Sequence, residues 1–248
     1  MPDETAPVAI VTGGARGIGL ATALDLSRKG YRIALADLDG PDLAAAVGRV
    51  GEGTLALPGD VGAFAAVQEQ AAAVLARFGR IDVLVNNAGI SQPKTLVEIS
   101  EDEYDRTIAV NLKGCFNWCK AAAPAMLAAG RGRIVNVSSV SANTGGARSA
   151  VSKFAYCTAK AGILGLTRAL AKELAPAVSV NAVCPGSIET ALTSGLIEAN
   201  REAIIGTIPL GRIGTPEDVA VVIAFLATVE PNYLTGEIID VDGGQWIN

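Results

Sequence analysis

The sequence predicts an α/β fold: a doubly wound parallel sheet of about seven strands with helices on both faces. Short apolar segments alternate with amphipathic helical segments along all 248 residues. Some apolar segments, such as Asp82–Asn86, are hydrophobic at nearly every position, which is typical of a strand buried on both faces of a parallel sheet. Parallel neighbours need helical crossovers between them, so the alternation itself indicates a parallel sheet.

The predicted strands and helices follow one another without interruption. Strands are predicted at Ala6–Thr12, Arg32–Ala36, Thr54–Leu57, Asp82–Asn86, Arg133–Ser138, Ser179–Cys184 and Ile238–Val241. Helices are predicted at Gly17–Lys29, Asp42–Val50, Ala63–Phe78, Glu101–Ala129, Phe154–Leu174 and Pro216–Thr228. No Pro- or Ser-rich linker divides this pattern, so residues 1–248 are expected to form a single domain. Ligands of such sheets bind at the carboxyl ends of the strands.

Composition limits the classes of function. The formal net charge is −5 and Lys and Arg are scattered, which argues against nucleic acid or an anionic membrane as a partner. Residues Met1–Pro7 lack the features of a signal peptide, and no apolar run approaches the roughly 18 residues that span a bilayer. The four cysteines show no paired framework, so a reducing compartment and a cytoplasmic location are expected.

The sequence contains no histidine. A histidine-based catalytic triad and a histidine-ligated zinc site are therefore excluded, and acid–base chemistry must come from Tyr, Lys, Asp, Glu or Cys. Asp240 and Asp242 are better explained as the end of a strand, so no metal site is expected. Cys115 and Cys119, four residues apart on a predicted helix, are expected to be small buried apolar residues.

A glycine-rich turn, Thr12–Gly19, connects the first predicted strand to the first predicted helix. Glycines let the backbone approach a pyrophosphate closely, and the helix N-terminus offers free N–H groups. The glycine spacing is related to GxGxxG, and a purely structural turn is the alternative. Its position between strand and helix favours a dinucleotide site. The cofactor-binding residues expected here are Gly13, Arg16, Gly17, Ile18 and Gly19.

Asp37 ends the second predicted strand. A carboxylate at this point can accept hydrogen bonds from the adenosine ribose hydroxyls and would repel a 2′-phosphate, although a solvated turn acid is the alternative. Arg16 could pair with a 2′-phosphate, but Leu38 supplies no second cation. The sequence therefore favours NAD as the cofactor over NADP. Asp60 and Val61, just after the third predicted strand, are expected to meet the adenine edge.

Several short motifs occur in order along the chain, most of them at the ends of the predicted strands. They are Thr12–Gly19, Asn86-Asn87-Ala88-Gly89, Asn111, Ser138-Ser139, Tyr156-Cys157-Thr158-Ala159-Lys160, Pro185-Gly186 and Thr190. With these motifs the chain resembles the short-chain dehydrogenase/reductase family from its first strand to its last. The resemblance implies a Rossmann-type fold and an NAD(P)-dependent oxidoreductase acting on CH–OH groups.

The resemblance implies Asn111, Ser139, Tyr156 and Lys160 as catalytic residues. Free tyrosine and lysine ionise near pH 10, so neither is a useful base alone at neutral pH. Lys160 lies four residues after Tyr156 on the same helix face, where its ammonium would pull the Tyr156 pKa toward working pH. Ser139 would donate a hydrogen bond to the substrate oxygen, and Asn111 would help to connect a water-linked proton path.

The same resemblance implies a second set of cofactor-binding residues. They are Asn87, Ala88, Gly89, Tyr156, Lys160, Pro185, Gly186, Ile188 and Thr190. Lys160 would hold the nicotinamide ribose, and the segment from Pro185 to Thr190 would form the wall beside the nicotinamide. A helix N-cap is the alternative role for Thr190.

The chain departs from the family pattern before Tyr156. The serine of the family usually lies about a dozen residues before the tyrosine, whereas a longer segment separates Ser139 from Tyr156 here. Residues 140–155 are therefore expected to form an enlarged loop at the substrate mouth. Ser138 and Ser141 are further candidates for the catalytic serine, but Ser138 should point to the opposite face of the strand. Ser139, Ser141 and Tyr156 are the expected substrate contacts.

Three functions remain. The first is hydride transfer between NAD(H) and a secondary alcohol or ketone, with a small polar polyol or sugar as substrate. The second is a 3-ketoacyl-(acyl-carrier-protein) reductase using NADPH, which the ending Asp242-Gly243-Gly244 also resembles. Arg131 fits one position where such enzymes dock their acidic carrier, but Pro176-Ala177 stands where a second basic residue is common. The third is a catalytically silent nucleotide-binding protein.

The family commonly forms tetramers, so a homo-oligomer, with a tetramer favoured, is expected to act on a small-molecule substrate. The apolar residues of the predicted helix Phe154–Leu174 could serve either the core or a subunit interface. These residues are Ile163, Leu164, Leu166 and Leu170.

Overall fold

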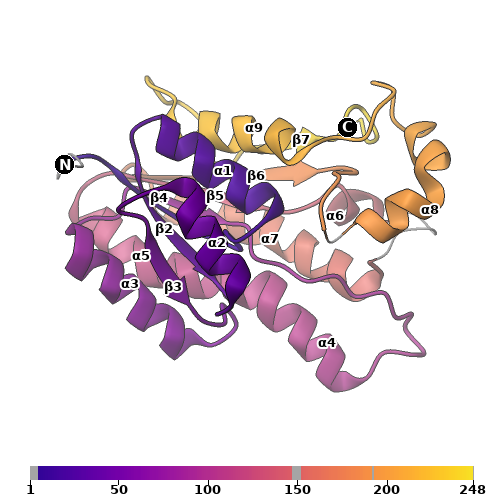
Figure 1. Ribbon diagram of the computed structural model, residues 1–248, viewed down its shortest axis with the longest axis horizontal. Coiled ribbons are helices and arrows are strands. Elements are labelled where there is room, and N and C mark those ends of the chain that lie inside the picture. Colours follow the sequence, from indigo (N-terminus) through magenta and orange to yellow (C-terminus); the bar gives the residue numbers. More distant parts are fainter. Residues whose placement is uncertain (1–4, 147–151, 192, 248) are drawn as a thin grey trace.

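The computed structural model describes residues 5–146, 152–191 and 193–247, and within them seven strands form one sheet (Figure 1). Every pairing is parallel, and the strand order is β3-β2-β1-β4-β5-β6-β7. The strands are β1 (Val8–Thr12), β2 (Arg32–Asp37), β3 (Leu55–Pro58), β4 (Val83–Asn86), β5 (Gly132–Val137), β6 (Val178–Pro185) and β7 (Ile238–Val241). The predicted doubly wound fold is confirmed, with strand boundaries close to those expected.

Helices cover both faces of the sheet (Figure 1). They are α1 (Gly17–Arg28), α2 (Pro41–Val50), α3 (Phe64–Phe78), α4 (Glu101–Ile108), the π-helix η1 (Ala109–Lys113), α5 (Gly114–Ala128), α6 (Ser141–Thr144), α7 (Phe154–Glu173), α8 (Ser194–Ile205) and α9 (Pro216–Thr228). A capping box formed by Thr215 and Asp218 begins α9.

Alternation along the strands divides the core into two layers. Val8 and Ile10 of β1 pack with α3, α5 and α7 on one face, while Ala9 and Val11 pack with α1, α2 and α9 on the other. Because both faces are covered, all four side chains are fully buried. The continuous apolar character of this strand therefore has a direct packing cause.

The strand order reverses between β1 and β4, which lie side by side although two strands separate them in the sequence. Loops that follow β1 and β4 leave the sheet in opposite directions at this point, which opens a crevice at their carboxyl ends. The fold thus places the glycine-rich turn after β1 beside Asn87-Ala88-Gly89 after β4.

The structure differs from the prediction in three helical regions. The single helix predicted at Glu101–Ala129 is divided by the π-helix η1, which contains Asn111. Such single π turns widen a helix locally and are frequent at functional sites. The sequence does not predict α6, which has only four residues, or α8, which is interrupted by a kink at Asn200. The predicted enlarged loop at 140–155 includes α6, and its residues 147–151 lie outside the described residues.

All four cysteines are buried and free, which confirms the expectation for Cys115 and Cys119. The apolar side chains of α7 turn toward the protein's own core, where Ile163 and Leu164 are buried. Leu166 and Leu170 are partly buried and pack against the same layer as α3 and α5. In the part of the chain that the structure describes, no helix is long and apolar enough to cross a membrane.

Candidate active site

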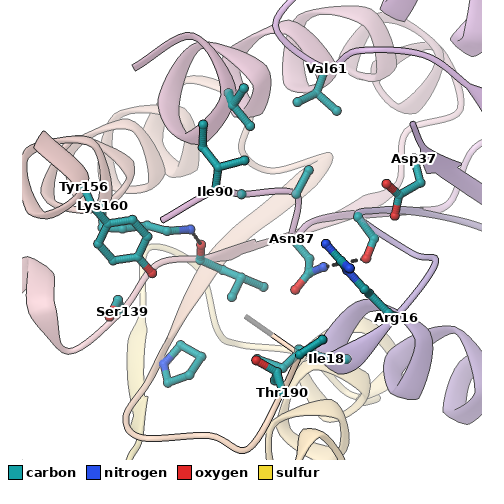
Figure 2. Close-up of a pocket in the computed structure, with 18 of the residues that line it drawn as sticks. Arg16, Ile18, Asp37, Val61, Asn87, Ile90, Ser139, Tyr156, Lys160 and Thr190 are labelled. Atoms are coloured by element: carbon teal, nitrogen blue, oxygen red, sulfur yellow. Dashed lines mark hydrogen bonds between the residues drawn. The ribbon is translucent and has the colours of Figure 1, made fainter. Parts of the chain in front are cut away.

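A cleft of about 280 Å³ lies at the carboxyl ends of the strands (Figure 2). It is lined by most of the residues that the sequence singles out: Gly13, Arg16, Gly17, Ile18, Asp37, Asp60, Val61, Asn87, Ala88, Gly89, Ser139, Tyr156, Lys160, Pro185, Gly186, Ile188 and Thr190. Gly19, Asn111 and Ser141 are not part of this lining. The cleft has two ends, with Asp37 and Arg16 at one and Ser139, Tyr156 and Lys160 at the other (Figure 2).

The glycine-rich turn needs its glycines for two different reasons. The backbone φ angles of Gly13 and Gly17 are 61° and 54°, values that residues with a Cβ rarely adopt. Gly19 faces the back of the turn, where an added Cβ would lie 2.1 Å from the Gly13 carbonyl oxygen. The turn can therefore present its N–H groups toward the cleft only because position 19 lacks a side chain.

Thr12 and Asn87 fasten this turn to the end of β4. The Thr12 hydroxyl accepts hydrogen bonds from the backbone N–H groups of Asn87 and Ala88, both at 3.0 Å. The Asn87 amide donates in return to the carbonyl oxygens of Thr12 and Gly13, also at 3.0 Å (Figure 2). The two loops of the crevice are thereby held as one rigid unit. In the sequence Thr12 is only the first residue of the turn, and nothing there indicates this role.

Acidic side chains and arginines face one another at the end of the cleft near β2 and β3. We term it the adenosine end, because the sequence predicts that the adenosine half of a dinucleotide binds there. The Asp37 carboxylate accepts hydrogen bonds from the N–H groups of Ala15 and Leu38, at 2.9 and 2.8 Å. Arg16 lies 3.8 Å from the carboxylate of Asp42, and both side chains are about 70 % exposed. Asp37 thus has no partner arginine among the ion pairs of the described residues.

Asp60 lies at the same end and is paired with Arg106. The arginine donates to one carboxylate oxygen of Asp60 at 2.5 Å, and the Gly62 N–H donates to the other at 2.8 Å. Burial alone would raise the pKa of the Asp60 carboxyl, but these two hydrogen bonds together hold the pKa below its ordinary value. Asp60 is therefore an ionised acceptor at neutral pH.

At the opposite end, which we term the catalytic end, Tyr156 and Lys160 project from the first turns of α7. The Lys160 ammonium lies 5.6 Å from the centre of the Tyr156 ring and donates to the Val137 carbonyl oxygen at 2.8 Å. Lys160 is only 4 % exposed, and this burial lowers the pKa of its ammonium to about 8. The ring of Tyr156 is partly exposed along the cleft.

Burial also raises the pKa of the Tyr156 hydroxyl to about 12, although a hydrogen bond with Ser139 acts in the opposite direction. The sequence predicts that Lys160 lowers the pKa of the Tyr156 hydroxyl toward neutral pH, and this prediction is wrong. Desolvation of the phenolate is the largest contribution, and Lys160 is not among the groups that lower this pKa. Among these groups, Tyr156 is a protonated acid at neutral pH.

The three candidate serines are separated by the structure. Ser138 is buried, and its hydroxyl donates to the carbonyl oxygen of Lys160 at 2.8 Å. Ser139 lies beside the Tyr156 hydroxyl, and its own oxygen accepts a hydrogen bond from the Ser141 N–H at 3.1 Å. Ser139 thus lies where a substrate contact is expected, whereas the Ser141 backbone orients it.

Asn111 lies behind the cleft on η1 and is 1 % exposed. Its amide holds both backbone groups of Ile90, accepting from the N–H at 3.2 Å and donating to the carbonyl oxygen at 3.0 Å. A Cβ at Gly89 would lie 2.7 Å from the Asn111 oxygen and 3.7 Å from the Lys160 nitrogen. Asn111 and Lys160 therefore flank the same short backbone segment.

The segment after β6 closes the catalytic end. Thr193, not Thr190, is the N-cap residue of α8, so the alternative role considered for Thr190 is wrong. The Thr193 hydroxyl donates to the Ile188 carbonyl oxygen at 2.6 Å and accepts from the Thr190 N–H at 3.0 Å. These bonds keep Thr190 on the cleft wall beside Gly17, where an added Cβ would meet its methyl group at 3.5 Å.

Other residues line the cleft without being expected as contacts from the sequence. They are Leu38, Gly59, Ile90, Arg106, Val110, Val137, Ala191 and Thr193. Ile90 and Ala191 directly follow predicted contacts, which is a usable signal. Arg106 reaches the cleft only because α4 packs beside the loop after β3, and nothing in its sequence neighbourhood indicates that. Within the described ranges no group of three or more His, Cys, Asp or Glu side chains could hold a metal ion.

Comparison with known proteins gives one consistent family. A family model described as enoyl-(acyl carrier protein) reductase matches residues 13–245. The 3-oxoacyl-[acyl-carrier-protein] reductase FabG of Thermotoga maritima is 43 % identical over 245 residues, covering 96 % of each chain. The acetoacetyl-CoA reductase of Shinella zoogloeoides is 40 % identical over 241 residues, covering 96 % of this chain and 98 % of the relative.

Solved structures agree with these relatives. A short-chain dehydrogenase/reductase, termed glucose/ribitol dehydrogenase, from Brucella melitensis superposes with a TM-score of 0.91 at 35 % identity and covers all of both chains. The structure of gox2181 gives a TM-score of 0.92 at 36 % identity, over 97 % of this chain and 95 % of that one. The resemblance seen in the sequence is confirmed: the chain belongs to the short-chain dehydrogenase/reductase family, nicotinamide-dependent oxidoreductases that act on CH–OH groups or the matching ketones.

Proposed function

We propose that this protein transfers a hydride between NAD(H) and the carbon of a secondary alcohol or ketone. The observation that carries the proposal is one continuous cleft with Tyr156, Lys160 and Ser139 at one end and Asp37 at the other. The cofactor accepts or gives the hydride when bound. The chain itself supplies the proton, the orientation of the substrate oxygen and the preference between cofactors.

The residues present fit a dinucleotide. The turn packs so closely against position 19 that only a glycine fits there. In this tight conformation the backbone N–H groups after Gly13 can face a pyrophosphate. In the proposed mechanism the Tyr156 hydroxyl gives its proton to the substrate oxygen during ketone reduction and takes it back during alcohol oxidation. A phenol with a pKa of about 12 is fully protonated at neutral pH, which suits the reducing direction.

Ser139 and Lys160 complete the proposed proton chemistry. The Ser139 hydroxyl is placed to donate to the same substrate oxygen and to stabilise the charge that develops on it. Lys160 would hold the nicotinamide ribose and carry a proton toward Tyr156. Asn111 acts through the backbone of Ile90 and would support the water path on the far side of Gly89.

Charge at the adenosine end supports NAD rather than NADP. Arg16 faces Asp42 and Arg106 is paired with Asp60, so both guanidinium groups already have carboxylate partners. A 2′-phosphate would in addition meet the carboxylate of Asp37. Steady-state rates with NADH and NADPH test this: kcat/KM should be at least tenfold higher with NADH. A preference for NADPH would overturn the choice of cofactor while leaving the reaction class intact.

The substrate class proposed is a small polar polyol or sugar. The polar residues Ser139, Thr190 and Thr193 line the catalytic end, and a known relative in structure is termed a glucose/ribitol dehydrogenase. Initial rates of NADH formation over a panel of polyols and aldoses would test it. If none is oxidised while β-keto esters are reduced, the polyol assignment fails.

A second candidate is reduction of 3-oxoacyl thioesters with NADPH, which relatives such as the Thermotoga maritima and Shinella zoogloeoides reductases favour. Arg131, which could dock an acidic carrier, precedes β5 and lies 3.5 Å from Asp82. It is therefore at the amino end of the sheet, away from the cleft of its own subunit. Acetoacetyl-CoA with each cofactor distinguishes this candidate from the first. Complete inactivity of NADH-binding protein on every panel would instead favour a catalytically silent protein.

We also propose a single domain that assembles as a homotetramer, with a cytoplasmic location supported by the four unpaired cysteines. Large apolar side chains remain exposed on the outer helices and the loop before β7: Phe116, Leu127, Val221, Phe225 and Tyr233. Exposed apolar patches of this kind often mark subunit contacts. Light scattering at micromolar concentration should give about four times the monomer mass, and a monomer would refute the tetramer.

A further inference from the structure

Arg106 lies at the adenosine end of the cleft, and the proposed function gives it no role. It is one of the cleft-lining residues, together with Asp37, Leu38, Asp60 and Val61. Its side chain is about half exposed even though it is paired with Asp60. The guanidinium therefore has one edge engaged and retains surface open to the cleft.

The loop that carries Asp60 is fixed to the helices around Arg106 by several contacts. The Asn117 amide donates to the Val61 carbonyl oxygen at 2.8 Å. A Cβ at Gly114 would lie 2.7 Å from a methyl group of Val61, and one at Gly62 would lie 3.4 Å from the Ala109 oxygen. Because η1 and α5, which directly follow α4 in the chain, hold this loop in place, Arg106 and Asp60 form one wall with a fixed geometry.

This wall has unused bonding capacity. Each carboxylate oxygen of Asp60 accepts one hydrogen bond from the protein, and such an oxygen can accept a second. A guanidinium is planar and weakly hydrated, so its face stacks well on aromatic rings. A purine with an exocyclic amine matches both properties, since the amine can donate to Asp60 while the ring lies against Arg106.

We propose that Arg106 is a binding residue for the adenine base of the cofactor, stacking on the purine while it holds Asp60 in position. The proposal rests on the proposed dinucleotide site. It assigns to Arg106 a contribution to affinity for the adenosine half of the cofactor, and none to the hydride-transfer step.

The experiment compares two reduced cofactors in the full-length enzyme. NADH has the adenosine half, and reduced nicotinamide mononucleotide lacks it. For Arg106→Ala, kcat/KM with NADH should fall about tenfold through a higher KM, with kcat within twofold of the wild type. With the mononucleotide, kcat/KM should stay within twofold. Arg106→Lys keeps the charge but not the planar group, so it should lose most of the same affinity for NADH.

Lys94→Ala is the matched control. Lys94 makes an exposed ion pair with Glu103, which lies on α4 like Arg106, but Lys94 does not line the cleft. It should behave as the wild type with both cofactors. Unchanged NADH kinetics in Arg106→Ala, or equal losses with NADH and the mononucleotide, would overturn the proposal. If Arg106→Ala does not fold, Arg106→Lys and Arg106→Gln carry the same comparison. Wild-type enzyme that binds neither cofactor would instead refute the proposed dinucleotide site.

Discussion

The two ends of the cleft are built from different kinds of interaction. At the catalytic end, Lys160 and Ser138 are almost completely buried and bond to backbone oxygens. At the adenosine end, the side chains of Arg16, Asp42 and Arg106 are 48–71 % exposed and pair with carboxylates or guanidinium groups nearby. Water screens the second group and not the first. Of the two ends, the catalytic end therefore has the larger pKa shifts, with that of Tyr156 raised to about 12 and that of Lys160 lowered to about 8.

The comparison teaches where substitutions should matter. A buried group cannot exchange its partner for water, so losing that partner is costly. An exposed ion pair is largely replaced by solvent, so its loss changes stability little. Changes at the catalytic end should thus alter rate and pH dependence, whereas changes at the adenosine end should alter affinity and cofactor choice.

The largest effect is expected for Tyr156→Phe. The substitution keeps the ring and removes the only proton that the proposed mechanism gives to the substrate oxygen. We expect kcat to fall by about 10²–10⁴, with NADH affinity within a few-fold of the wild type, measured by steady-state kinetics and fluorescence titration. Tyr104→Phe is the matched control, because Tyr104 stacks on Phe154 at 6.2 Å and should keep that contact without its hydroxyl. Full activity in Tyr156→Phe would refute the assignment of the acid.

Gly19→Ala should affect both ends at once, because the turn lies between them. Its Cβ would lie 2.1 Å from the Gly13 oxygen and 2.6 Å from the Asn87 amide nitrogen. We expect a loss of about 1–3 kcal/mol or more in unfolding free energy and at least a tenfold loss in NADH affinity. Gly48→Ala on α2, where an added Cβ meets nothing within 4 Å, is the control and should be neutral or stabilising. Normal cofactor binding by Gly19→Ala would show that the turn can relax.

Lys160→Met tests the burial of the ammonium through stability. The pKa of Lys160 is lowered to about 8 from an ordinary value of 10.5, so between these pH values the unfolded chain binds more protons than the folded one. Stability from this group therefore rises as pH increases from 8 toward 10.5, by at most about 1.4 kcal/mol per pH unit. In denaturant titrations, the unfolding free energy of the wild type minus that of Lys160→Met should increase as the pH rises across this range. A constant difference would argue against a lowered pKa.

The smallest effect is expected for Arg16→Ala at the adenosine end. Its pair with Asp42 is long and exposed, so the unfolding free energy should change by less than about 1 kcal/mol. Arg28→Ala, which removes another exposed pair far from the cleft lining, provides the reference for such a loss. A destabilisation well beyond that of Arg28→Ala would mean that the two ends differ less than their exposure indicates.

The fold could be predicted because its signals are local. β1 and β4 are apolar throughout because both of their faces are covered, and this is visible in the sequence itself. The π-helix η1 could not be predicted, since its contacts, such as those of Asn111 with the backbone of Ile90, join segments far apart in the sequence. The helix α6 is too short to show an apolar period, and the kink at Asn200 interrupts the period of α8.

The site could be predicted where one short motif carries several groups, as with Tyr156 and Lys160 on α7. Arg106 could not, because only the packing of α4 beside the loop after β3 brings it to the cleft. The direction that the sequence predicts for the Tyr156 pKa shift is also wrong. That direction depends on the balance between burial and nearby charge, and burial is known only from the three-dimensional arrangement.

Two hydrogen bonds join α7 to the end of β5 in both directions: Lys160 donates to the Val137 oxygen, and Ser138 donates to the Lys160 oxygen. Together these two hydrogen bonds fix the position of α7 on the strand, since the helix cannot slide or rotate without breaking both. The position of Tyr156 is thereby decoupled from the length of the segment that precedes it. Insertions or exchanged loops between Ser141 and Lys153 should be tolerated without loss of the proton-transfer geometry, which makes this segment a natural place for substrate range to diversify or be engineered.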